Sequence, residues 1–314
     1  MEEPINKSER AKRNLLRNVR RQRLKYITIL PSLITLLNGT CGFAAIVFAA
    51  RAGQSDVTSF NVYNHQFPFF SMSCYMIFIA MLADMLDGHV ARISQSTSSF
   101  GGQLDSLCDV ISFGIAPAFL MLQVVENRVS FVNPAFDVFV YRFLWLTAAI
   151  YLGCAAIRLA RFNVENEEDE ASHMSFWGLP TPAAAGVIAS LVILNQDIIK
   201  NLSGSSYSIL SHMEYNIILA ALPFITLGVS ILMVSRIRYP HIVNQYLKGR
   251  KPFAQFIKAI VFIVIIIISM EVALVLLFCG FALSGVSKWF YYRFIIHKTD
   301  LGQAEEPPII TISH

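Results

Sequence analysis

The sequence predicts an all-α polytopic membrane protein with about eight transmembrane helices and both termini in the cytoplasm. Its 314 residues are 55% hydrophobic and only 15% charged, which excludes a water-soluble domain with an ordinary polar surface. Apolar stretches near the roughly 20 residues that cross a bilayer follow one another along the chain. The basic residues fall mainly on alternate connections between these stretches, as the positive-inside rule requires.

Six apolar stretches each suit one membrane crossing. They are residues 25–50, 68–90, 103–123, 139–160, 179–196 and 214–235. The last stretch, 253–288, has about 36 residues and would be roughly 54 Å long as one helix, which is too long for a single crossing. We expect two helices that turn near Glu271, placing this carboxylate at a membrane face; a buried functional Glu271 is the alternative.

The distribution of lysine and arginine sets the orientation. Nine of the 25 lie within residues 1–25, so we expect a cytoplasmic N-terminus and an amphipathic arm that contacts anionic lipid headgroups, with no nucleic acid as partner. Eight crossings then put 21 basic residues inside and four outside. The chain divides into the arm 1–25, a six-helix membrane core 26–235, a basic cytoplasmic linker 236–252, a two-helix hairpin 253–288 and a cytoplasmic tail 289–314.

Four aspartates concentrate within 26 residues of this apolar chain. Ionisable groups at membrane depth are costly, so such a cluster indicates a functional site. Asp84 and Asp87 are three residues apart and Asp105 and Asp109 are four apart, so on helices each pair shares one face. Two helices joined by the Ser, Thr and Gly stretch 94–102 can bring the four carboxylates around one centre. Their repulsion favours a hard divalent cation, Mg²⁺ or Mn²⁺ with Ca²⁺ possible.

Residues next to the aspartates suit a phosphate-bearing ligand. Gly88 and Ala91 lack bulk, which lets a ligand lie against the helix, and Arg92 supplies a fixed cation. The connection 91–102 is cytoplasmic in the predicted topology. We therefore expect an integral membrane protein whose site faces the cytoplasm, in the inner membrane if the cell is bacterial, where a lipid and a water-soluble group meet.

The run from Asp84 to Asp109, Asp-x2-Asp-Gly-x2-Ala-Arg-x8-Gly-x3-Asp-x3-Asp, resembles the signature of the CDP-alcohol phosphotransferases at every fixed position. The resemblance covers roughly residues 25–235. It implies a six-helix core, usually a homodimer, that binds a CDP-linked alcohol and a divalent metal, transfers the phosphoryl-alcohol unit to a second alcohol and releases CMP. It also implies metal ligands (Asp84, Asp87, Asp105 and Asp109, the last as general base) and a CDP pocket (Asp84, Gly88, Ala91, Arg92, Gly101 and Asp105).

Other stretches resemble the branch of this family that uses CDP-diacylglycerol and L-serine. They are residues 33–42, 104–117, 156–164 and 178–186. The carboxylate of serine requires a cation, and Arg158 and Arg161 lie three residues apart at the cytoplasmic end of the fourth predicted helix; ordinary positive-inside residues are the alternative. Asn163 either meets the acceptor or ends the helix. Asn38 on the first helix is the fourth acceptor candidate.

Two other functions stay open. The same chemistry can use another acceptor, namely glycerol 3-phosphate, an inositol phosphate or choline. A cation transporter is the more remote alternative, because transport predicts carboxylates spread across the membrane and across repeated halves, whereas here they lie on one helix pair and no internal repeat is visible.

Overall fold

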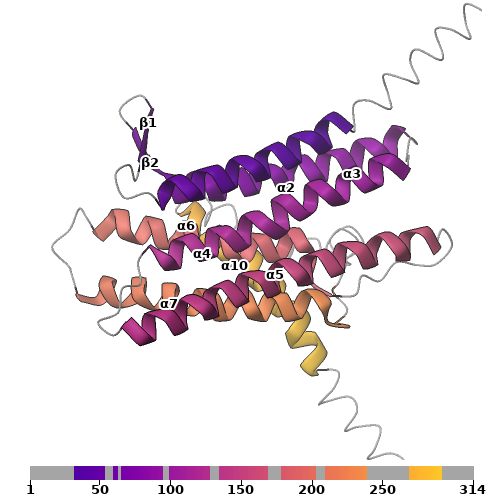
Figure 1. Cartoon of the computed structure of the whole chain (residues 1–314). Helices are drawn as coiled ribbons and strands as arrows, with labels where there is room; N and C mark the ends of the chain where they lie inside the picture. The colour runs from indigo at the N-terminus through magenta and orange to yellow at the C-terminus, as the bar shows by residue number, and fades with distance from the viewer. Residues whose placement is uncertain are drawn as a thin grey trace, which may run out of the picture.

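The computed structural model describes residues 32–53, 59–62, 65–94, 99–127, 134–168, 178–202, 209–237, 239 and 269–291. Within these ranges, seven helices are long and apolar enough to cross a membrane. Figure 1 shows most of them lying side by side along one direction. The predicted helical membrane architecture is therefore confirmed for seven crossings. The predicted helix before residue 269, which is the seventh in chain order, and both predicted cytoplasmic ends lie outside the described residues.

The order of elements follows the predicted one, with one addition. A two-stranded antiparallel hairpin, in which Ser59 pairs with Pro68, precedes the second long helix. The all-α prediction missed it because each strand has only four residues. The elements are the first helix Ser32–Ala52, β1 Ser59–Val62, β2 His65–Pro68, α2 Phe69–Ser94, α3 Ser99–Asp109, η1 Val110–Ile115, α4 Ala116–Glu126, α5 Pro134–Glu168, α6 Thr181–Leu202, α7 Ile209–Val234 and α10 Met270–Tyr291.

Several helices are longer than the sequence predicted. α2 continues to Ser94 and α3 begins at Ser99, so residue 94 and residues 99–102 of the expected connection are helical. Its Ser and Gly residues indicated a loop, although membrane helices tolerate both. α5 continues to Glu168, five residues beyond Asn163, so the alternative that Asn163 ends this helix is wrong. The glutamates that follow Asn163 are good helix formers.

The first helix packs closely against the helix that carries Asp105 and Asp109. A Cβ atom built on Gly39 would lie 2.8 Å from Cys108 Sγ, and one on Gly42 would collide with Ser112. Small residues allow such close approach between membrane helices. The contact places the N-terminal half of the first helix directly beside the aspartates.

The last helix, α10, lies against α6 and starts where the sequence predicted a turn. Ser269 caps it, because the backbone N–H of Val272 donates to Ser269 Oγ at 3.4 Å. In its middle, the Phe278 ring occupies the space left by Gly186 on α6 and stacks on Phe78 of α2, with ring centroids 5.7 Å apart. α10 crosses the bundle obliquely in Figure 1.

Tyr239 fastens the other half of α10 to the segment that follows α7. Its hydroxyl donates to the carbonyl of Ala282 at 3.1 Å, and its ring lies where a side chain on Gly285 would be. Burial raises the pKa of Tyr239 to about 12, so the hydroxyl keeps its proton and stays a donor.

Gly178 joins the start of α6 to the end of α7. Its φ of +80° is in the left-handed region, and a Cβ there would collide with the carbonyl of Met233. The Gly178 N–H donates to Ile237 O at 2.8 Å, and the next N–H donates to Leu232 O at 3.0 Å. These contacts hold the start of α6 in place against the segment at the end of α7.

Gly178→Ala is expected to destabilise the protein by more than about 1 kcal/mol, because alanine disfavours this backbone conformation and its methyl group meets Met233 O. Thermal unfolding in detergent measures the effect. Gly153→Ala is the matched control, since Gly153 lies within α5 and a Cβ built on it would meet no neighbouring atom within 4 Å. Equal melting temperatures for the two variants would contradict the prediction.

Candidate metal and active site

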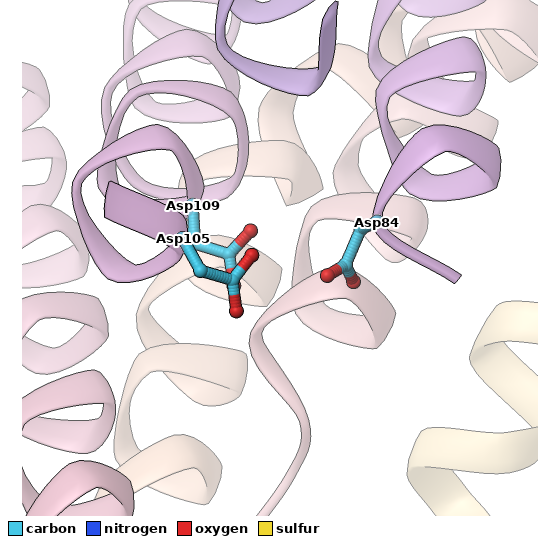
Figure 2. Close-up of side chains that lie close together, drawn as sticks. All are labelled: Asp84, Asp105 and Asp109. Carbon is cyan, nitrogen blue, oxygen red and sulfur yellow. The ribbon is translucent and has the colours of Figure 1, made fainter. Parts of the chain in front are cut away.

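Three carboxylates converge from two helices. Asp84 comes from α2, and Asp105 and Asp109 come from successive turns of α3. One oxygen from each of the three lies within 4.8 Å of the others. Figure 2 shows the side chains of Asp105 and Asp109 directed across the gap toward Asp84. The i,i+4 spacing on α3 and the position of α2 opposite it produce this arrangement.

The donor set of these three residues fits a hard divalent cation. All the ligand atoms are carboxylate oxygens, which is the set that Mg²⁺, Mn²⁺ and Ca²⁺ prefer. Asp105 Oδ1 is buried and has no hydrogen-bond partner among the described residues. A buried oxygen without a partner is destabilising, and like charges at this distance repel each other. A cation bound between the carboxylates would remove both penalties.

Asp87, the fourth predicted ligand, is not in this group of three. It lies one turn after Asp84 on α2 and is buried, with only 5% of its surface exposed. Its carboxylate accepts hydrogen bonds from the Thr35 side chain and from the backbone of Gly88. Its Oδ2 is buried without a partner among the described residues. The structure therefore places Asp87 beside the cluster and ties it to the first helix.

A π-helical turn, η1, begins directly after Asp109. Pro117 follows it and has no N–H to donate to the carbonyl of Phe113, four residues earlier. The hydroxyl of Tyr151 on α5 donates to this carbonyl instead, at 3.0 Å. Such turns occur frequently at functional sites, and this one directly follows the aspartate-bearing turns of α3. Pro117 was the available signal for it, although sequence reasoning did not use it.

Asn38 contacts the aspartate cluster directly. Its Nδ2 donates to Asp109 Oδ1 at 2.9 Å, and both side chains are buried. Asn38 Oδ1 is buried without a partner among the described residues. The backbone carbonyl of Asn38 accepts a hydrogen bond from Ser112 Oγ at 2.9 Å. The residue predicted to meet the acceptor is thus bonded to the predicted general base.

The other acceptor candidates lie on the last turns of α5. Arg158 is half-buried and Arg161 is exposed. Asn163 Nδ2 donates to Ser106 Oγ at 2.7 Å. Ser106 is the residue after Asp105, so this bond fastens the end of α5 to the aspartate-bearing part of α3. Sequence reasoning did not single out Ser106, because only its position next to Asp105 pointed to it.

One of the predicted nucleotide residues, Gly88, lies at an open part of α2. Gly88 is exposed, and a Cβ built on it would have no other atom within 4 Å. Gly101 lies in the first turn of α3 and is half-buried. Ala91 and Arg92 belong to α2, but their side chains lie outside the described part of the chain. The space at Gly88 allows a ligand to approach the helix backbone beside Asp87.

The sequence is similar to a family of known enzymes over most of this bundle. Residues 28–226, from before the first helix into α7, match the profile of the CDP-alcohol phosphatidyltransferase family. A Helicobacter pylori protein named CDP-diacylglycerol–serine O-phosphatidyltransferase is 31% identical over 222 residues, covering 71% of this chain and 81% of the relative. α10 lies beyond the matched residues.

Relatives from two other organisms show the same degree of similarity. A Bacillus subtilis protein of the same name is 30% identical over 212 residues, which are 68% of this chain and 90% of the relative. An archaetidylserine synthase from Methanothermobacter thermautotrophicus is 32% identical over 216 residues, covering 68% of this chain and 70% of the relative. The similarity thus extends across bacterial and archaeal proteins.

Proposed function

The chain belongs to the CDP-alcohol phosphatidyltransferase family, and from this premise we propose that it transfers the phosphatidyl group of CDP-diacylglycerol to the hydroxyl of L-serine. The products are phosphatidylserine and CMP. The observation that carries the proposal is the convergence of Asp84, Asp105 and Asp109, in a chain whose bacterial relatives are named for this reaction. Family membership also replaces the cation transporter as an interpretation of the carboxylates.

Each aspartate has a proposed task in this reaction. Asp84, Asp87, Asp105 and Asp109 hold a divalent ion, with Mg²⁺ and Mn²⁺ as the first candidates. When bound, this ion neutralises charge on the diphosphate and makes CMP a better leaving group. Asp109 accepts the proton of the serine hydroxyl. The serine oxygen forms the new bond to phosphorus, and the bond from phosphorus to the CMP oxygen breaks.

The remaining proposed contacts divide between the two substrates. Gly88, Ala91, Arg92 and Gly101 line the nucleotide pocket, and the open space at Gly88 supports this role. Arg158 and Arg161 bind the carboxylate of serine, because a guanidinium suits bidentate carboxylate recognition. The bond from Asn163 to Ser106 supports a site here, since it brings the last turns of α5 beside the aspartates.

The protein is an integral membrane protein, with seven described helices able to cross a bilayer. We propose that its site faces the cytoplasm, where L-serine and CMP are soluble. The positive-inside distribution of the basic residues supports this orientation. A homodimer, and contact of the basic arm with anionic lipid headgroups, complete the proposal.

CMP release tests the function. We expect purified protein with CDP-diacylglycerol and Mn²⁺ to release CMP when L-serine is added, and to release much less with glycerol 3-phosphate, an inositol phosphate or choline, because a phosphorylated acceptor needs more cationic groups than the two arginines. Release with one of these acceptors alone would keep the family chemistry and replace serine. Absence of release with every acceptor would contradict the catalytic proposal.

A further inference from the structure

We propose that Asn38 is a positioning residue, which orients the carboxylate of Asp109 for proton transfer and does not bind the acceptor. The inference rests on the proposed function, because it assigns Asn38 to the base of that reaction. It changes the role expected for Asn38 from the sequence. Three features of the structure lead to it.

The first feature is the hydrogen bond itself. Asn38 Nδ2 donates to Asp109 Oδ1 at 2.9 Å across two helices, 71 residues apart in the chain. A carboxylate rotates about its last side-chain bond unless one oxygen is held. Fixing Oδ1 sets the plane of the group and therefore the direction of the lone pairs on the second oxygen. Proton transfer depends on this direction.

The second feature is that the backbone of Asn38 is itself held in place. Its backbone carbonyl accepts the hydrogen bond from Ser112 Oγ at 2.9 Å. Gly39, the next residue, contacts Cys108, and Gly42 contacts Ser112 one turn later. The first helix therefore has little freedom to slide along α3, and the amide of Asn38 stays at one place relative to Asp109.

The third feature is burial, which distinguishes positioning from acceptor binding. Asn38 has no exposed surface, and one N–H of its side-chain amide is bonded to Asp109. The side chain is therefore enclosed by protein, whereas a group that binds the carboxylate of a serine molecule must be reachable from the solvent-accessible site.

The other end of the same helix offers a comparison. There Asn127 Nδ2 donates to the backbone carbonyl of Ala52 at 3.1 Å. This bond also links the first helix to the membrane span that contains α3 and α4. This bond ends on a backbone group and lies far from the aspartates. A substitution at Asn127 removes an amide that links the same pair of elements without touching Asp109, so it is a matched control.

The test compares the steady-state kinetics of four proteins: wild type, Asn38→Ala, Asn38→Asp and Asn127→Ala. We expect both Asn38 variants to lower kcat by about tenfold or more, with KM for L-serine and for CDP-diacylglycerol within about threefold of wild type. Asn127→Ala is expected to keep the kcat of wild type. Asn38→Asp preserves the packing volume, so it carries the test if Asn38→Ala does not fold.

A double variant identifies the group through which Asn38 acts. In the Asp109→Asn background, Asn38→Ala is expected to lower the residual kcat by less than about threefold, because the carboxylate that it positions has been removed. A full additional loss in the double variant would overturn the inference. So would a rise in KM for serine with unchanged kcat, which would return Asn38 to the acceptor, or an equal loss of kcat in Asn127→Ala.

These outcomes are separable from failure of the proposed function. If wild-type protein releases no CMP with any acceptor, the function itself is wrong and the role of Asn38 is overturned with it. If wild type is active and Asn38→Ala has the same kcat, only the positioning role is wrong.

Discussion

Asp109→Asn is expected to lower turnover by on the order of 100-fold or more while leaving CDP-diacylglycerol binding in place. Asparagine has almost the same size and shape as aspartate, so the packing of this buried side chain against the first helix is kept. Its amide oxygen can still accept the hydrogen bond from Asn38. It has no carboxylate to take the proton of the attacking hydroxyl, so the loss falls on the chemical step.

Two measurements separate catalysis from binding in this variant. CMP release at saturating L-serine gives turnover, and calorimetric titration with CDP-diacylglycerol in detergent gives affinity. Asp137→Asn is the matched control, because Asp137 lies in the first turn of α5, roughly 39 Å along that helix from Asn163 at the site end. An equal loss of turnover and of affinity in Asp109→Asn would count against its role as the base.

Asp105→Asn is expected to weaken binding of the divalent ion by roughly 100-fold or more, because it removes a charged ligand from the group of three. Activity should then recover in part as the concentration of Mn²⁺ is raised, since excess metal offsets a lost ligand by mass action.

Wild-type protein should lose activity with a chelator and regain it with Mn²⁺ or Mg²⁺.

Direct Mn²⁺ binding, followed by electron paramagnetic resonance of the free ion, provides a readout that does not depend on turnover. The same Asp137→Asn control should bind Mn²⁺ as wild type does. An unchanged affinity for Mn²⁺ in Asp105→Asn would exclude Asp105 as a ligand, even if the variant is inactive.

The sequence predicted the parts of the site that depend on short-range helical geometry. Asp105 and Asp109 share a face because they are one turn apart, and Asp84 on the preceding helix lies opposite them. Such relations follow from 3.6 residues per turn and need no knowledge of the other helices. The same reasoning located the seven described crossings, because length and hydropathy alone identify a membrane helix.

The sequence did not predict the contacts that depend on how one helix lies against another. The bond from Asn38 to Asp109 joins residues 71 positions apart, and Thr35 reaches Asp87 across the same interface. Both contacts require one position of the first helix along its axis relative to the neighbouring helices. Close contacts at Gly39 and Gly42 determine this axial position, which a hydropathy pattern does not reveal.

The predicted end of a helix comes too early where polar residues continue the helix beyond its apolar stretch. The sequence allows Asn163 either to meet the acceptor or to end the helix, but α5 continues through it to Glu168. Composition marks the boundary of the apolar stretch, whereas hydrogen bonding marks the boundary of the helix. The two differ most at the site end of α5, where the helix extends past the last apolar residues.

The contact between Gly186 and Phe278 has a consequence for how this sequence can vary. Gly186 lies within the region shared with the family, whereas Phe278 belongs to a helix beyond it. Because the phenyl ring fills the space where any side chain at position 186 would stand, the two positions cannot change independently. The last helix therefore restricts the evolution of a core to which it does not belong, and a relative without such a helix is free to carry a side chain where this chain has Gly186.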